Sequence, residues 1–79
     1  MLTLYLQPFC HYCERVLRFI SEHELSVHTK DISREASVAT ELIALGGKRQ
    51  VPYLIDETAG VSMYESADII EYLKTHYVH

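Results

Sequence analysis

The amino-acid sequence predicts a small α/β domain in which a four-stranded mixed sheet is built in the order β-α-β-α-β-β-α. Three features of the 79 residues lead to this class. Apolar residues alternate at the start, follow a helical period after residue 10, and form two short runs around a turn late in the chain. A parallel βαβ unit joined to an antiparallel hairpin makes a mixed sheet that helices can cover. The length allows one domain, residues 1–79.

The first half of the chain carries a strand, a helix and a second strand. Leucines at alternate positions between Leu2 and Leu6 predict the first strand. From Cys10 onward, apolar residues with helical spacing predict an amphipathic helix that ends near His23. This apolar stripe consists of Cys13, Val16, Leu17 and Ile20. Residues 26–32 predict a second, more polar strand.

A second helix is expected next, with Ser33 as its N-cap and Gly46-Gly47 at its end. Its apolar positions are Val38, Leu42 and Leu45. Residues 51–55 and 61–64 then predict two strands joined by the turn at 57–60.

The last element is a helix that starts at Ser66, with apolar residues Ile69, Ile70 and Leu73. The resulting order of elements is that of the thioredoxin fold.

Composition excludes several classes of protein. Seven basic against eleven acidic residues give a net charge of −4, which argues against a nucleic-acid reader. No apolar run approaches the length of a membrane span, and residues 1–6 lack the basic leader of a secretory signal. Two cysteines are too few for a disulfide-stapled miniprotein. We therefore expect a monomer in a reducing cytoplasm, with no nucleic-acid or membrane partner.

The two cysteines stand in one motif, Cys10-His11-Tyr12-Cys13, at the start of the first predicted helix. Free backbone N–H groups and the positive end of the helix dipole stabilise a thiolate on Cys10. Cys13 lies on the apolar stripe and is expected to be the more buried sulfur. A stabilised thiolate departs readily, so this arrangement favours thiol–disulfide exchange.

Two other interpretations of the motif remain open. It could be half of a zinc site that recruits His11 or His23, although no second Cys/His pair has finger spacing. It could also be a structural disulfide, which a reducing compartment disfavours.

The segment Tyr5-Leu-Gln-Pro-Phe-Cys-His-Tyr-Cys13 resembles the active-site segment of glutaredoxins. Gln50-Val51-Pro52 and Tyr64-Glu65-Ser66-Ala67-Asp68-Ile69-Ile70 extend the resemblance over nearly the whole chain, and the latter is most similar to the glutathione-transferase-like branch. The resemblance implies a glutathione-dependent thiol–disulfide oxidoreductase, with glutathione as co-substrate and no required metal. Cys10 would carry the glutathionyl group, and Cys13 would resolve protein disulfides.

The resemblance also implies a glutathione site. The Val51–Pro52 bond is cis in this family, which would let the Val51 backbone pair with the tripeptide as an added strand does. The other interpretation is a proline at a strand start. Glu65 would accept a hydrogen bond from the glutamyl ammonium, and free N–H groups at Ser66 would hold the γ-glutamyl carboxylate. Ser66 could instead be an ordinary N-cap.

Further contacts are implied less directly. Tyr12 would flank the thiol, or would be an exposed loop tyrosine. Lys48 or Arg49 would meet the glycyl carboxylate, or both would be solvated charges. His11 would tune the thiolate, or would be an exposed first-turn histidine.

The sequence departs from the family at three points. Gln7 stands where many glutaredoxins have a lysine, His11 replaces a common proline, and no helical second domain follows within the 79 residues. Two further hypotheses therefore stay open. One is a [2Fe–2S] carrier that holds its cluster through Cys10 and glutathione across a dimer, and the other is a transferase-like domain that serves only as an interaction platform.

Overall fold

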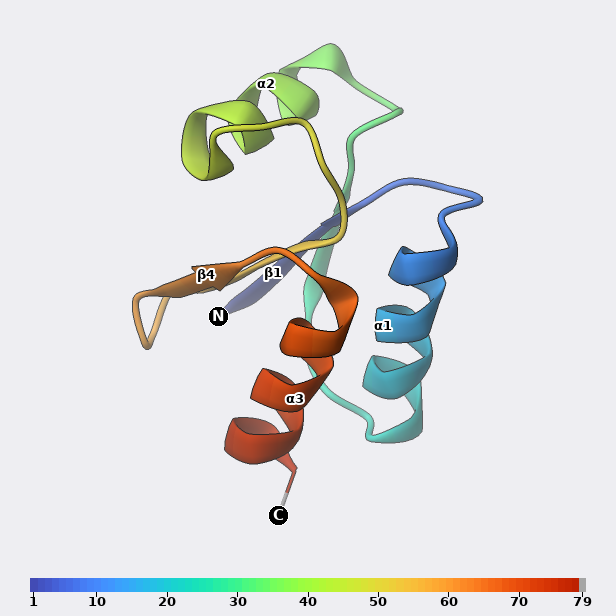
Figure 1. The fold of residues 1–79 in the computed structure, drawn as a ribbon, viewed down its shortest axis with the longest axis vertical. Coiled ribbons are helices and arrows are strands. Elements are labelled where there is room, and N and C mark those ends of the chain that lie inside the picture. The colour runs from blue at the N-terminus through green and yellow to red at the C-terminus, as the bar shows by residue number, and fades with distance from the viewer. Residues whose placement is uncertain (79) are drawn as a thin grey trace.

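The computed structural model describes residues 1–78, so His79 of the predicted domain lies outside the described residues. The elements are β1 (Leu2–Leu6), α1 (His11–Glu22), β2 (His28–Asp31), α2 (Ala36–Gly46), β3 (Tyr53–Asp56), β4 (Val61–Met63) and α3 (Ser66–Tyr77). Figure 1 shows how they are arranged. The predicted order and the thioredoxin-like fold are confirmed.

The four strands form one mixed sheet in the order β2-β1-β3-β4. β1 runs parallel to β2 and antiparallel to β3, so Leu4 pairs with Thr29 on one side and with Leu54 on the other. β3 and β4 are the predicted antiparallel hairpin. The parallel pair follows from the α1 crossover, which carries the chain from β1 back to start β2 beside it.

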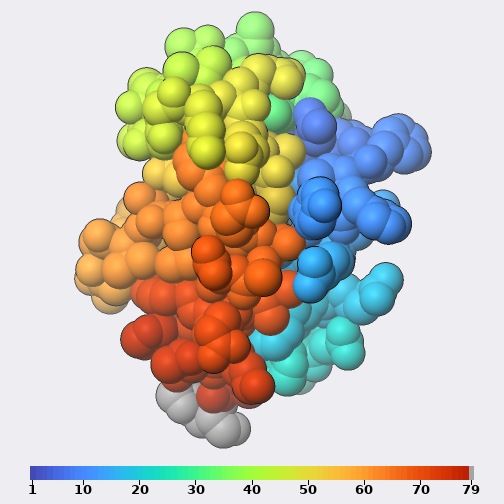
Figure 2. Space-filling model, viewed as in Figure 1, coloured from blue at the N-terminus to red at the C-terminus, as the bar shows by residue number. Residues whose placement is uncertain are grey.

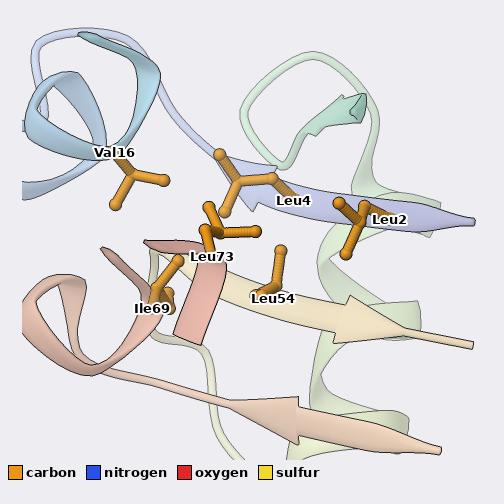
Figure 3. Packing of buried hydrophobic residues seen from close by; sticks show 6 residues of the cluster. All are labelled: Leu2, Leu4, Val16, Leu54, Ile69 and Leu73. Atoms are coloured by element: carbon orange, nitrogen blue, oxygen red, sulfur yellow. The ribbon is translucent and has the colours of Figure 1, made fainter. Parts of the chain in front are cut away.

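One face of the sheet packs against α1 and α3. Alternation along β1 directs leucines to this face, where they meet one apolar stripe from each helix. Figure 3 shows the side chains converging. The six buried residues of this cluster are Leu2, Leu4, Val16, Leu54, Ile69 and Leu73.

The opposite face packs against α2 and is more aromatic. Tyr5 and Tyr53 are neighbours on adjacent strands, with ring centroids 6.0 Å apart, and Leu42 of α2 covers them. Helices therefore cover both faces of the sheet. From the C-terminal end of β1 the chain runs into the segment that carries Cys10.

The structure corrects two expectations for α2. Ser33 does not cap this helix, because its hydroxyl and its backbone N–H both donate to Asp31 and close a turn after β2. Glu35 is the N-cap residue, and α2 starts at Ala36. Leu45 is 54% exposed rather than on the packed face. The predicted end is correct, since Gly47 caps the helix with φ of 88°.

The end of α1 agrees with the prediction, and the starts of two strands differ from it by two residues. α1 ends at Glu22 with His23 as its C-cap, where the sequence predicts it, and Cys10 is its N-cap. β2 starts at His28 rather than residue 26, and β3 starts at Tyr53 rather than residue 51.

A buried carboxylate ties the end of α3 to the sheet. Asp56, the last residue of β3, is 1% exposed and accepts hydrogen bonds from the hydroxyl groups of Tyr72 and Tyr77. Burial raises the pKa of Asp56, but the hydrogen bonds from the two tyrosines and from the Ala59 N–H outweigh it and hold the pKa below its usual value. Asp56 is therefore a charged anchor for the C-terminal turns of α3.

Candidate active site

Cys10 stands where β1 has ended and α1 begins. Its backbone is extended, with φ of −97° and ψ of 112°, and its sulfur caps the helix. Cys10 Sγ accepts a hydrogen bond from the Cys13 backbone N–H, with 3.2 Å between the two atoms. This is the position of a serine or aspartate cap, filled here by a sulfur that faces the free donors of the first turn.

Cys13 has a different environment. It is 1% exposed, and both cysteines are free thiols. Burial raises the pKa of the Cys13 thiol to about 12, and a hydrogen bond with Cys10 adds to the rise. The prediction that Cys13 is the more buried sulfur is confirmed, and Cys13 is protonated at neutral pH while Cys10 remains partly exposed.

The residues around Cys10 leave it accessible. Phe9 is fully exposed and has a left-handed backbone, with φ of 60°. His11 and Tyr12 are both exposed, which favours the interpretation of His11 as a solvated first-turn histidine. Within residues 1–78, no group of three or more His, Cys, Asp or Glu side chains converges as a metal site would require.

A cleft of about 330 Å³ adjoins the start of α1. That volume is at the small end of the range for ligand pockets, roughly 300–1,000 Å³. Figure 2 shows the face where the yellow segment near residue 50 and the orange segment near residue 65 approach the blue start of α1. The cleft is lined by Tyr12, Gln50, Val51, Pro52, Glu65 and Ser66.

Five of the six predicted glutathione contacts thus come together in the cleft. The Val51–Pro52 bond is cis, as expected from the resemblance. Val51 precedes β3, and none of the hydrogen bonds found within residues 1–78 uses its backbone N–H or C=O. One wall of the cleft therefore offers a free backbone donor and acceptor.

The opposite wall is the start of α3. Glu65 occupies the N-cap with φ of 70°, and its side chain makes no cap hydrogen bond. The alternative that Ser66 is the N-cap is therefore wrong, because Ser66 is the first residue of the helix and is buried. The Glu65 carbonyl accepts from the Ile69 N–H at 3.0 Å, which leaves the earlier N–H groups of the helix without helical partners.

Lys48 is the predicted contact that lies outside the cleft. Its ammonium is 4.7 Å from the centre of the Tyr64 ring, in a cation–π contact. Arg49, the alternative, is exposed and does not line the cleft either. Gln50 lines the cleft but was not predicted as a contact, and its amide donates to Glu65 Oε1 at 3.4 Å. Its position directly before Val51-Pro52 is the sequence signal that could have identified it as a cleft residue.

In a comparison with known families, residues 4–79 match the glutathione S-transferase N-terminal domain. No curated protein sequence matches the chain. Among solved structures, a delta-class glutathione transferase from Nilaparvata lugens is 28% identical with a TM-score of 0.79, over 98% of this chain and 36% of that one.

Two further structures share the fold. Human glutathione transferase theta-2, solved in complex with glutathione and an unknown ligand, is 20% identical with a TM-score of 0.82, over 98% of this chain and 32% of that one. A thioredoxin-like protein is 20% identical with a TM-score of 0.79, over 94% of this chain and 90% of that one. The chain spans about a third of the length of the transferases that it matches. Within residues 1–78, no helix is both long and apolar enough to span a bilayer.

Proposed function

The chain belongs to the family of glutathione S-transferase N-terminal domains, and from this premise we propose that it is a glutathione-dependent thiol–disulfide oxidoreductase. It reduces glutathione mixed disulfides and protein disulfides through Cys10 and Cys13. The observation that carries the proposal is a pair of unequal thiols at the start of α1, beside the cleft that Tyr12 lines. An accessible helix-capping sulfur with a buried second thiol suits repeated exchange.

Glutathione would bind along the two walls of the cleft. The free N–H and C=O of Val51 would pair with the tripeptide backbone, with Pro52 and Tyr12 beside it. The unpaired N–H groups that begin at Ser66 would hold the γ-glutamyl carboxylate, and Glu65 would accept from the glutamyl ammonium. Support comes from the match to a glutathione transferase family and from the relative that was solved with glutathione. Lys48, directed to Tyr64, is left out of this arrangement.

The reaction with a mixed disulfide has two exchange steps. The Cys10 thiolate attacks the glutathione sulfur of a protein–S–S–glutathione substrate, a new Cys10–glutathione disulfide forms, and the protein thiolate leaves and takes up a proton. A second glutathione thiolate then attacks the glutathione sulfur on Cys10. Oxidised glutathione is released and the Cys10 thiolate is regenerated. The disulfide of oxidised glutathione joins the glutathionyl group from the substrate to the second glutathione.

A protein disulfide would use both cysteines. Cys10 attacks one substrate sulfur and forms a mixed disulfide, and the Cys13 thiol then loses its proton and attacks Cys10 Sγ. The substrate leaves with two thiols, and the new Cys10–Cys13 disulfide is reduced by two glutathione molecules. Because its pKa is about 12, Cys13 stays protonated and unreactive until a disulfide forms next to it.

We further propose that residues 1–79 act as one glutaredoxin domain, a monomer that requires no metal and binds neither nucleic acid nor membrane. A reducing cytoplasm with abundant glutathione would keep both thiols in the free state that the structure has.

The test is turnover of a glutathionylated peptide, coupled to glutathione reductase and the oxidation of its reduced nicotinamide cofactor. We expect turnover that depends on glutathione and that is lost in Cys10→Ser. Absence of turnover in the wild-type protein would refute the proposal and leave the interaction-platform hypothesis. A coloured, cluster-bearing dimer on purification would instead support the iron–sulfur hypothesis.

A further inference from the structure

Tyr64 connects the two chain segments that form the walls of the cleft. It directly precedes Glu65, and its hydroxyl donates a hydrogen bond to the backbone carbonyl of Lys48 at 2.8 Å. Lys48 lies two residues before Gln50 in the segment between α2 and β3. One side chain therefore joins the wall that carries Val51 to the wall that carries Ser66.

The tyrosine ring is fixed on several sides. Its centroid lies 4.4 Å from that of Tyr53, and the Lys48 ammonium lies 4.7 Å above it. Gly46, the last residue of α2, leaves the space that the hydroxyl needs, because a Cβ at this position would lie 2.2 Å from Tyr64 Oη. Burial raises the pKa of Tyr64, so the hydroxyl remains a donor at neutral pH.

Only one other hydrogen bond found within residues 1–78 joins these two segments. It runs from the Gln50 amide to Glu65 Oε1, it is exposed, and it is 3.4 Å long. Both bonds lie at the surface, but a bond of 3.4 Å between two side chains that can each rotate holds geometry poorly. The shorter bond from Tyr64 to a backbone carbonyl is the stronger constraint on the spacing of the walls.

From these contacts we infer that Tyr64 is a positioning residue for glutathione binding. It does not line the cleft. It acts through the segments on either side, holding the Val51 backbone at the distance from the α3 N-terminus that the tripeptide must bridge. The assignment to glutathione rests on the proposed function, whereas the connection between the walls belongs to the chain itself.

Three variants separate this role from a general loss of packing. Tyr64→Phe removes only the hydroxyl and keeps the ring contacts. Gly46→Ala leaves Tyr64 unchanged but places a methyl group where its hydroxyl lies, and alanine is a better helix former than glycine. Tyr53→Phe is the matched control, because it removes a tyrosyl hydroxyl that bonds the Leu45 carbonyl rather than the cleft segments.

Two readouts are measured on each variant of the 79-residue chain. We expect the KM for glutathione to rise about three- to tenfold in Tyr64→Phe and Gly46→Ala, the range for one lost neutral hydrogen bond, with kcat unchanged. In the free protein, hydrogen exchange of the Ile69 amide should accelerate in both variants, because this amide bonds Glu65 and reports the order of the α3 wall. Tyr53→Phe should keep the wild-type KM and the wild-type exchange rate at Ile69.

A wild-type KM in Tyr64→Phe would overturn the inference, and so would an equal rise in Tyr53→Phe. Absence of glutathione-dependent turnover in the wild-type protein would overturn the proposed function and the assignment to glutathione together. In that case the exchange rate at Ile69 would still decide whether Tyr64 connects the two walls.

Discussion

The sulfur of Cys10 accepts a hydrogen bond from the backbone N–H of Cys13, and 3.2 Å separates the two atoms. The same turn of α1 that directs this donor at Cys10 carries the Cys13 side chain into the core, where it is 1% exposed. The first turn of one helix therefore gives two identical side chains opposite environments. The thiol at the helix cap is partly exposed to solvent, and the thiol one turn on is desolvated.

The first prediction is that the two cysteines differ in function. Cys10→Ser should abolish turnover of glutathionylated peptides, because no other accessible thiol can accept the glutathionyl group. Cys13→Ser should retain most of this turnover, since free glutathione can complete the exchange, but should lose reduction of protein disulfides. Steady-state assays with both substrate types check this, and equal losses in the two variants would contradict the roles assigned.

The second prediction concerns alkylation. With a pKa of about 12, Cys13 is thiolate in only about one molecule in ten thousand at pH 8, and its side chain is buried. Iodoacetamide should therefore modify Cys10 alone in the folded protein between pH 7 and pH 9, and both cysteines after denaturation. Peptide mass spectrometry distinguishes the sites. Rapid labelling of Cys13 in the folded protein at pH 8 would contradict the conclusion that its side chain is buried and protonated.

The third prediction concerns Glu65. Replacing it by Gln removes the charge but keeps the size, and a charge-assisted hydrogen bond to the glutamyl ammonium is worth about 1.5–3 kcal/mol. The apparent affinity for glutathione should fall roughly tenfold or more, with little change in thermal stability. Asp68→Asn is the control, since Asp68 is an exposed acid in the same helical turn that does not line the cleft. Similar losses in both variants would indicate a general charge effect.

The fourth prediction concerns Asp56 and acid stability. The folded-state pKa of Asp56 is lowered, so its stabilising contribution is complete above the unfolded pKa of about 3.9 and is lost as the pH falls through the folded value. Asp56→Asn should lower the free energy of unfolding at pH 7 by about 1.5–3 kcal/mol, because it weakens charge-assisted bonds from Tyr72 and Tyr77. Urea denaturation at a series of pH values from 7 downward should show this difference shrinking in acid, as the wild-type carboxyl takes up its proton. Exposed Glu57→Gln serves as the control, and a difference that persists in acid would refute the assignment.

The fifth prediction is that Glu24→Gly stabilises the protein. α1 ends in a Schellman motif, in which Leu25 N–H donates to the Ile20 carbonyl and Glu24 N–H to that of Ser21. Glu24 holds a left-handed backbone with φ of 51°, which glycine adopts without a steric penalty. Relief of about 1–2 kcal/mol of left-handed strain exceeds the roughly 0.5–1 kcal/mol of backbone entropy that glycine loses on folding, so the free energy of unfolding should rise by roughly 0.5–1 kcal/mol, measured by urea denaturation. Glu22→Gly, within the helix, should lower it instead.

Local patterns predicted the elements of the fold well. The leucines of β1 and the stripe around Val16 have different periods, and each period is set by the geometry of its own segment. The cap of α2 was missed for an equally local reason. Ser33 has two possible partners, the helix start and Asp31, and the turn after β2 takes it. The sequence does not show which partner prevails, because a serine hydroxyl can either accept from a free N–H at a helix start or donate to a nearby carboxylate.

By itself the sequence determined the order of elements, the helix-capping thiol and the family, because these depend on motifs and on spacing along the chain. Only the tertiary structure decided which side chains from distant parts of the chain come into contact. Folding brings Gln50 to Glu65, directs Lys48 onto Tyr64 rather than into the cleft, and buries Asp56 under Tyr72 and Tyr77. These contacts join residues 15 or more positions apart. They form only once the sheet and its helices have packed, so no local pattern can specify them.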